Sequence, residues 1–313
     1  MRVFVTGGTG HSGSSIVDEL IAAGHEVTGL ARSDTAAAAL SAQGAKVRRG
    51  DLEDLDGLRE AAADSDGVIH VAHRQDLLFS GGIHAVAAAE VPIMLAYGEA
   101  LEGTGKPLVA AGSIGSPGQG LLGRTATEED PALPSDDEFK GTLRARNVVE
   151  TTVIGLAERG VRSSVVRIAN FAHDTTDRAG FLPVLIALAK EKGFVGYPGD
   201  GANLWNAVHA RDLASLFRLA LEKGPAGRYW HGVDDGGIPF REIAEAIGSR
   251  LGLPAVSVPL DELVLPGYFG FLANVVTQTY PASNLITRRT LGWEPAQPGL
   301  LADLDNGHYF PAG

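Results

Sequence analysis

The stretch MRVFVTGGTGHSG, residues 1–13, begins with a short apolar run that leads directly into glycines and small hydroxyl residues. Residues 3–6 predict a β-strand, and Ile16, Leu20 and Ala23 then recur at helical spacing. A strand, a glycine loop and a helix in this order favour phosphate binding, because the first N–H groups of the helix point at the anion. The stretch therefore predicts the start of an α/β sheet with a nucleotide at its edge.

The loop has the pattern T-G-x-x-G-x-x-G, beginning at Thr6. Gly7 allows the sharp turn after the strand, Gly10 lets the backbone approach a pyrophosphate, and Gly13 lets the helix pack closely on the sheet. In this context the spacing predicts a bound dinucleotide rather than a purely structural turn. The residues expected around the phosphates are Thr6, Gly7, Thr9, Gly10, His11, Ser12 and Gly13.

Strand-like and helix-like stretches alternate through the first half of the chain. The predicted strands are 3–6, 26–31, 45–50, 67–72, 106–112 and 162–169, and the predicted helices are 11–23, 35–42, 53–63, 83–103 and 138–159. Strands separated by helices of this length pair in parallel, with right-handed crossovers. We expect an α/β fold with a Rossmann-type doubly wound parallel sheet. Residues 1–170 would form the dinucleotide-binding domain, and 171–313 a smaller substrate-side lobe integrated with the same sheet.

Composition excludes several partners. The chain has 313 residues, of which 44% are hydrophobic, and a formal net charge of −12. The acidic balance argues against non-specific binding to nucleic acid or anionic membranes, and no apolar run is long enough for a membrane span. The chain has no cysteine, and no His, Asp or Glu spacing matches a metal site. Because no secretory signal precedes the first predicted strand, we expect a cytoplasmic protein.

The end of the predicted strand 26–31 decides between NAD and NADP. An acidic residue there would bind the 2′-hydroxyl of NAD, whereas an arginine accommodates the 2′-phosphate of NADP. Arg32 and Ser33 stand where the ribose should lie. Asp34 comes too late for that role and is expected to cap the next helix. The sequence therefore favours NADP over NAD.

Further motifs follow the glycine loop in the order RRGDLED (48–54), GVIHVAH (67–73), VVRIANF (165–171), NAVHARDLA (206–214) and LGWEP (291–295). From residue 2 to about residue 304 the chain resembles the extended, epimerase/dehydratase-like short-chain dehydrogenase/reductases. The residues that this resemblance places at the cofactor are Asp51 and Leu52 at the adenine, Val71, Ala72 and His73 on the ribose side, and Ala169 and Asn170 near the nicotinamide. It also implies a homodimer formed through the predicted helices 83–103 and 138–159.

Members of this family normally carry a Tyr-x-x-x-Lys pair after the fifth strand, and the tyrosine exchanges a proton with the substrate. By the same resemblance Ser113 takes the position of the serine that orients the substrate oxygen, and Thr142 and Arg146 take the places of Tyr and Lys. None of the six tyrosines is followed by lysine four positions later. Arg146 can still bind ribose hydroxyls, but it does not act as a base. The chain therefore looks like an atypical member of the family.

Other side chains could supply the proton. His73 ends the fourth predicted strand at the edge where ligands bind, and His173, Asp174 and His209 are expected at the same edge. Tyr197 lies in a loop that often borders the substrate in the family that the chain resembles. For each histidine the alternative is a structural hydrogen bond to the backbone or a bond to the cofactor ribose.

Relatives that act on nucleotide sugars carry an arginine for the diphosphate where this chain has Trp205, so such a substrate is disfavoured. Trp205 either lines an apolar pocket or belongs to the core. The expected function is an NADP-dependent oxidoreductase for a small, largely apolar carbonyl, alkene or imine substrate of the kind found in secondary metabolism. Two alternatives stay open. One is a non-redox cyclase, isomerase or dehydratase, and the other is an NADP-binding sensor similar to NmrA-like regulators.

Overall fold

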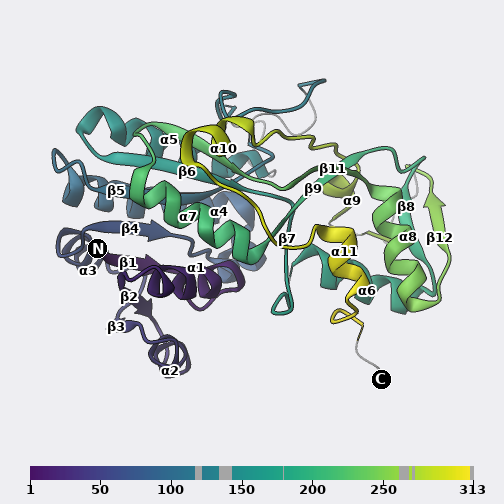
Figure 1. Cartoon of the computed structure of the whole chain (residues 1–313), viewed down its shortest axis with the longest axis horizontal. Coiled ribbons are helices and arrows are strands. Elements are labelled where there is room, and N and C mark those ends of the chain that lie inside the picture. The colour runs from purple at the N-terminus through teal and green to yellow at the C-terminus, as the bar shows by residue number, and fades with distance from the viewer. Residues whose placement is uncertain (117–121, 134–142, 179, 261–267, 270–271, 311–313) are drawn as a thin grey trace.

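Seven parallel strands form the main sheet in the order β10-β6-β5-β4-β1-β2-β3 (Figure 1). The structure is a computed structural model that describes residues 1–116, 122–133, 143–178, 180–260, 268–269 and 272–310. The strands of the main sheet are β1 (Arg2–Thr6), β2 (Glu26–Ala31), β3 (Lys46–Arg49), β4 (Gly67–His70), β5 (Pro107–Ser113), β6 (Arg162–Ile168) and β10 (Arg228–Gly232). The six predicted strands are present, and β10 adds a seventh beside β6. The expected α/β fold with a Rossmann-type sheet is confirmed.

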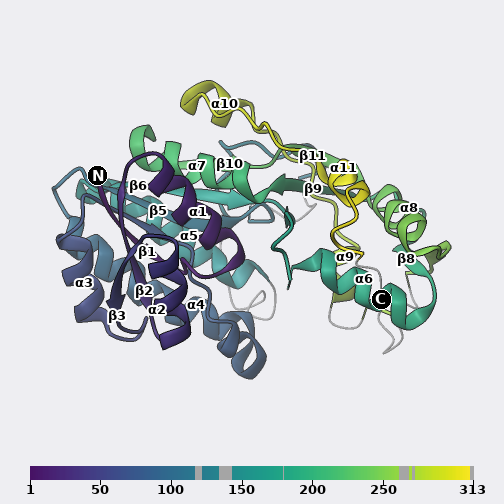
Figure 2. The same ribbon diagram turned by 60° about the horizontal axis from the view of Figure 1, so that its bottom comes forward.

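Helices cover both faces of this sheet (Figure 2). One face carries α1 (His11–Ala22), α2 (Asp34–Ala42) and α7 (Ala210–Lys223), and the other carries α3 (Leu55–Ala63), α4 (Gln75–Leu101) and α5 (Asn147–Gly155). Alternate side chains of β1 point to the two faces. Val3 and Val5 pack with the α1 side, and Phe4 packs with the α4 side. Burial on both faces explains why β1, β4 and β5 read as nearly continuous apolar runs.

Two helices differ from the predicted ranges. α4 begins at Gln75, well before residue 83, and its helical backbone is interrupted at Gly82, where φ is +71°. The stretch predicted as one helix over 138–159 contains the 3-10 helix η2 (Leu143–Arg146), then α5, then the 3-10 helix η3 (Leu156–Arg159). Residues 138–142 lie outside the described residues. No helix in the described ranges is long and apolar enough to cross a membrane.

A second lobe lies beside the main sheet, on the right in Figure 1. Its strands form a three-stranded sheet, β11-β9-β7, and a two-stranded sheet, β12-β8. The elements of this lobe are β7 (Phe171–His173), α6 (Phe181–Lys192), β8 (Val195–Pro198), β9 (Leu204–His209), β11 (Asp235–Pro239), α8 (Phe240–Leu251), β12 (Ala255–Val258), α9 (Ala273–Val276) and α11 (Leu300–Asp305). The helix α10 (Leu285–Leu291) packs instead against α7 and β10 of the main sheet. Because α7 and β10 come between β9 and β11 in sequence, the chain returns to the main sheet before it completes the lobe.

Trp205 lies at the centre of the lobe's own hydrophobic core. Its side chain is fully buried, and its ring lies 5.0 Å from Phe171, 5.5 Å from Phe181, 5.3 Å from Phe240 and 5.9 Å from Tyr280, between centroids. Aromatic rings at these separations in tilted or edge-to-face arrangements are favourable contacts within a core. The alternative left open by the sequence is therefore decided, and Trp205 is a core residue.

Two buried histidines make the stability of the fold sensitive to acid. Burial lowers the pKa of His70 in β4 to about 4 and that of His231 in β10 to about 3, in each case from 6.5. From pH 6.5 down to pH 4 the unfolded chain therefore binds protons that the folded chain does not. The free energy of unfolding is expected to fall with falling pH by about 1.4 kcal/mol per pH unit for each histidine, measured by urea unfolding.

The variant His231→Asn separates the contribution of His231 to the pH dependence of stability from the contribution of acidic side chains. The asparagine amide can replace the bond between His231 Nδ1 and the carbonyl oxygen of Ser283, which are 2.8 Å apart, without titrating. The variant is expected to lose less stability than the wild type between pH 6.5 and pH 4. The same substitution at the exposed His84 is the control and should leave the slope unchanged. Equal slopes for wild type and His231→Asn would contradict the account.

Candidate cofactor and active site

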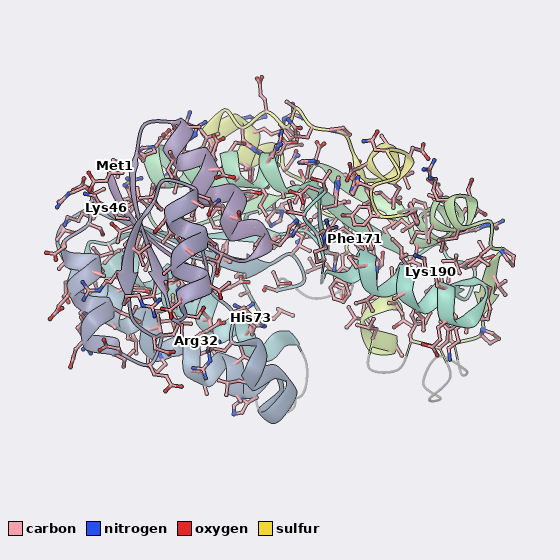
Figure 3. The ribbon with its side chains drawn as sticks, turned by 90° about the horizontal axis from the view of Figure 1, so that it is seen from below. Met1, Arg32, Lys46, His73, Phe171 and Lys190 are labelled. Carbon is pink, nitrogen blue, oxygen red and sulfur yellow. The ribbon has the colours of Figure 1, made fainter. Side chains whose placement is uncertain are left out.

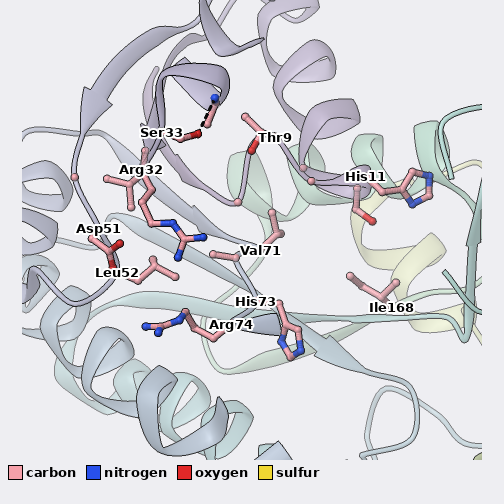
Figure 4. Close-up of a pocket in the computed structure, with 18 residues that line it drawn as sticks. Thr9, His11, Arg32, Ser33, Asp51, Leu52, Val71, His73, Arg74 and Ile168 are labelled. Carbon is pink, nitrogen blue, oxygen red and sulfur yellow. Dashed lines mark hydrogen bonds between the residues drawn. The ribbon is translucent and has the colours of Figure 1, made fainter. Parts of the chain in front are cut away.

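A cavity of about 580 Å³ lies at the carboxyl ends of β1, β2, β4 and β6 (Figure 4). From β1 the chain adds β2 and β3 on one side of the sheet and β4, β5 and β6 on the other. The connections that follow β1 and β4 therefore run in opposite directions, and a crevice opens between them. Figure 3 shows Arg32 and His73 together on this side of the sheet, and Phe171 and Lys190 in the second lobe. The residues that line the cavity are Gly7, Thr9, Gly10, His11, Ser12, Gly13, Leu30, Arg32, Ser33, Ala36, Gly50, Asp51, Leu52, Val71, Ala72, His73, Arg74 and Ile168.

The glycine loop has the geometry that a pyrophosphate requires. Gly7 adopts φ +79°, and a Cβ there would lie 2.5 Å from the backbone nitrogen of Ala72. A Cβ at Gly13 would lie 2.0 Å from the carbonyl oxygen of Gly7. Gly10 is the N-cap of α1 and brings no side chain to the cap. The first turn of α1 therefore presents its N–H groups to the cavity, so the loop fits the phosphates of a dinucleotide.

Gly13→Ala is expected to destabilise the loop and weaken dinucleotide binding. The added methyl group would force α1 away from the Gly7 carbonyl, and overpacking of this kind costs about 1–3 kcal/mol. The matched control is Gly155→Ala in α5, where a Cβ meets nothing within 4 Å and the backbone is helical. Thermal unfolding and NADPH titration check both variants. A Gly13→Ala protein as stable as the wild type would contradict this reading of the loop.

The end of β2 presents Arg32 and Ser33 to the cavity. Ser33, not Asp34, is the N-cap of α2, because its hydroxyl accepts a hydrogen bond from the N–H of Ala36 at 3.2 Å. The expectation that Asp34 caps the helix is thus corrected. Asp34 lies in the first turn, where Arg49 donates to its carboxylate at 2.8 Å. At this strand end Arg32 lines the cavity, whereas the carboxylate of Asp34 is fully exposed.

Most residues predicted at the cofactor line the cavity. Thr6, Arg146, Ala169 and Asn170 do not. The Thr6 hydroxyl is instead bonded to His70 Nδ1 at 2.7 Å, and Ala169 is buried. The lining residues that sequence reasoning missed are Leu30, Ala36, Gly50, Arg74 and Ile168. Leu30, Gly50 and Ile168 lie in or directly after predicted strands, so a survey of every strand end would have found them.

Ser113 ends β5 beside a buried ion pair. Glu150 of α5 accepts a hydrogen bond from the Ser113 N–H at 2.9 Å and another from the Ser116 hydroxyl. Its second oxygen accepts from Arg167 Nε at 3.0 Å. Arg167 is itself fully buried, 3.7 Å from the centroid of the Tyr229 ring. This pair fixes the backbone of the strand end and so fixes where the Ser113 hydroxyl lies.

A second ion pair lies closer to the cavity. Glu90 of α4 has a side chain that is 1% exposed, and Arg146 of η2 donates to its Oε2 from Nη2 at 2.7 Å and from Nε at 3.2 Å. His73, which lines the cavity, has its Nδ1 3.4 Å from Glu90 Oε1. Burial alone would raise the pKa of Glu90, but the Arg146 charge and the contact with His73 lower it to about 2. Arg146 and His73, two predicted site residues, are therefore joined by a carboxylate that the sequence did not reveal.

The other candidate histidines are held by carboxylates or by the backbone. His11 in the glycine loop is bonded through Nε2 to Asp174 at 2.9 Å. Burial opposes the charged form of His11, but Asp174 outweighs it and raises the pKa. His173 is fully buried and bonded to Asp303 at 2.8 Å, while His209 caps α7 by accepting from the N–H of Arg211. Neither His173 nor His209 lines the cavity.

The structure does not bring Tyr197 to the cavity. Tyr197 lies in β8, in the core of the second lobe, and the guanidinium of Arg241 lies 5.8 Å from its ring centroid. None of the tyrosines in the described ranges lines the cavity. Thr142 lies outside the described residues. Of the predicted catalytic residues that the structure describes, His73 is the one at the cavity wall.

This fold and this cavity define an α/β protein of the Rossmann type with a crevice at the carboxyl ends of its parallel strands. The sequence profile described as the NAD dependent epimerase/dehydratase family matches residues 3–231. The chain belongs to this family, whose members use a nicotinamide dinucleotide, and is an enzyme of the short-chain dehydrogenase/reductase type.

Two relatives and one solved structure illustrate the likeness. "Uncharacterized protein C2A9.02" of Schizosaccharomyces pombe is 40% identical over 312 residues, covering 99% of this chain and 100% of that protein. A Stigmatella aurantiaca protein named 4-hydroxy-2-methyl-3-oxo-4-farnesyl-3,4-dihydroquinoline-1-oxide ketoreductase is 29% identical over 269 residues, covering 82% of this chain and 75% of that protein. The structure of DesIV, a dTDP-glucose 4,6-dehydratase from Streptomyces venezuelae with NAD and TYD bound, superposes with a TM-score of 0.75 at 20% identity, over 99% of this chain and 98% of that chain.

Proposed function

We propose that this chain is an NADP-dependent oxidoreductase for a small, largely apolar carbonyl, alkene or imine substrate, with His73 as the proton donor. A nicotinamide dinucleotide, when bound, supplies the hydride. The residues of this chain would hold the phosphates on the glycine loop, the adenosine near Arg32 and Asp51, and the reacting end near His73 and Ile168, as the arrangement in Figure 4 suggests.

The observation that carries the choice of NADP is the position of Arg32. Its side chain lines the cavity at the end of β2, where a ribose 2′-substituent lies in proteins of this fold. The carboxylate of Asp34 is paired with Arg49 and does not line the cavity, whereas an acid that binds the ribose of NAD would. A guanidinium paired with a phosphate forms strong, charge-assisted hydrogen bonds.

Two observations support the proposed substrate class: the lack of a diphosphate-binding arginine and the name of one relative. The position that the family uses for a diphosphate-binding arginine holds Trp205 here, and this tryptophan is buried in the core of the lobe. Without that arginine a nucleotide sugar is a poor substrate. The Stigmatella relative is named as a ketoreductase of a farnesylated quinoline oxide, a largely apolar ketone. Both observations support a largely apolar substrate, and the second supports a ketone.

The direct test is oxidation of NADPH by the pure protein against a panel of ketones, aldehydes, enones and imines. We expect at least one class to consume NADPH in proportion to the protein added. If the protein binds NADPH but no compound of the panel causes a loss of NADPH absorbance, the redox function is contradicted.

A non-redox function is the second candidate, because none of the described tyrosines lies at the cavity. A cyclase, isomerase or dehydratase on this fold would keep turning over after the dinucleotide is removed. Tight NADPH binding without any turnover, together with association of a partner protein that depends on the dinucleotide, would instead favour a sensor.

We also propose a homodimer that forms through α4 and α5. Leu95 on α4 is 41% exposed and Val148 on α5 is 37% exposed, so both helices carry large apolar side chains at the surface. Light scattering of the wild type and of a Leu95→Glu variant tests it. A monomeric wild type would contradict this part of the proposal.

A further inference from the structure

Glu90 has two oxygens with different surroundings. Oε2 accepts both hydrogen bonds from Arg146. Oε1 lies 3.4 Å from His73 Nδ1 and has no hydrogen-bond partner within the part of the chain that the structure describes. A buried carboxylate oxygen without a donor is costly, and a separation of 3.4 Å is slightly too long for an N–H···O bond. His73, whose side chain is 30% exposed at the cavity wall, is placed to close that distance.

We propose that Glu90, held by Arg146, fixes His73 as the tautomer that carries its proton on Nδ1, so that Nε2 is the atom that exchanges a proton with the substrate. A carboxylate that accepts from one ring nitrogen selects the tautomer and stabilises the imidazolium that forms during proton transfer. Glu90 is thus a positioning residue and His73 the catalytic residue. The inference rests on the proposed oxidoreductase function.

The proton balance follows from this arrangement. In carbonyl reduction the hydride adds to the carbonyl carbon, and the Nε2–H bond of the His73 imidazolium breaks as the new O–H bond forms. The neutral imidazole left behind keeps its Nδ1–H on Glu90 and regains the second proton from water. Glu90 remains a carboxylate throughout, because Arg146 stabilises its charge.

The other titratable neighbour does not compete for this role. His70 of β4 interacts electrostatically with Glu90, Arg146 and His73. Its Nδ1 is bonded to the Thr6 hydroxyl at 2.7 Å, and burial lowers its pKa to about 4. His70 is therefore neutral at physiological pH. Among His70, Glu90 and Arg146, the charged groups are therefore Glu90 and Arg146.

The tautomer can be read from the ring ¹⁵N shifts of His73 at alkaline pH. We expect the wild type to show the Nδ1–H form. In Glu90→Gln the amide oxygen should stay on Arg146, which can only donate. The amide NH₂ would then face His73 Nδ1, so that nitrogen must accept and the ring must change to the Nε2–H form.

Glu222 provides a matched control. It also lies between a histidine and an arginine, with His25 Nε2 2.9 Å from Oε1 and Arg218 Nη1 3.0 Å from Oε2, but it belongs to α7 outside the cavity. Glu222→Gln should leave the His73 spectrum unchanged.

Three results would overturn the inference: an Nε2–H tautomer in the wild type, no tautomer change in Glu90→Gln, or the same change in the control. If Glu90→Gln does not fold, the wild-type spectrum still decides. NADPH titration of the same samples keeps the two proposals apart. A protein with the expected tautomer that does not bind NADPH would reject the oxidoreductase function while leaving the geometry of His73 established.

Discussion

Arg32→Glu should lower NADPH affinity by about 100-fold, which corresponds to about 2.8 kcal/mol, and should raise the affinity for NADH. The substitution removes the guanidinium that faces the 2′-phosphate and puts in its place a carboxylate that repels it. The same carboxylate can accept hydrogen bonds from the ribose 2′-hydroxyl of NADH. Calorimetric titration with both reduced dinucleotides measures the reversal.

The matched control for charge reversal is Arg124→Glu. Arg124, whose side chain is 53% exposed, pairs with Asp130 and does not line the cavity, so its replacement by glutamate changes the net charge by the same amount. NADPH affinity should then stay within about twofold of the wild type, because exposed charges far from a ligand are screened by salt. An Arg32→Glu protein that still prefers NADPH would show that another group reads the 2′-phosphate.

His73→Asn should lower kcat by about 100-fold or more, because general acid–base groups typically contribute a factor of 10²–10⁴. Asparagine keeps a polar side chain at the cavity wall but cannot give up a proton at neutral pH. NADPH affinity should stay close to that of the wild type, since the glycine loop and Arg32 remain in place. Steady-state kinetics with the best substrate of the carbonyl panel, together with NADPH titration, separates the two effects.

The exposed His84 on α4 supplies the control for this prediction as well. His84→Asn should leave kcat and KM unchanged. If His73→Asn retained full kcat, the proton would have to come from water or from another side chain, and the role of His73 would be limited to lining the cavity.

The fold and the cofactor side of the site could be predicted because their signals are local. The turn, the close approach and the helix packing at Gly7, Gly10 and Gly13 all fall within one short stretch of sequence. In a parallel sheet the carboxyl ends of the strands meet at one edge, so Arg32 and His73 could be placed together from strand order alone. The edge strand β10 was missed because it lies in the second half, where Pro and Gly break the alternation of strands and helices.

The catalytic side could not be predicted because it depends on contacts between distant segments. Glu90 lies in the middle of α4 and meets Arg146 only when η2 packs against that helix. A single glutamate in a helix carries no sequence signal that its side chain is buried and charged. The position of Trp205 was undecided for the same reason, since the rings around it come from β7, α6, α8 and the segment that contains Tyr280.

Calorimetric titration of the pure wild-type protein with NADPH and NADH tests this account most directly. We expect saturable binding of both dinucleotides, with NADPH bound more tightly, and loss of that difference in Arg32→Glu. No measurable affinity for either dinucleotide would contradict it, because the glycine loop, Arg32 and His73 would then surround a cavity built for some other ligand.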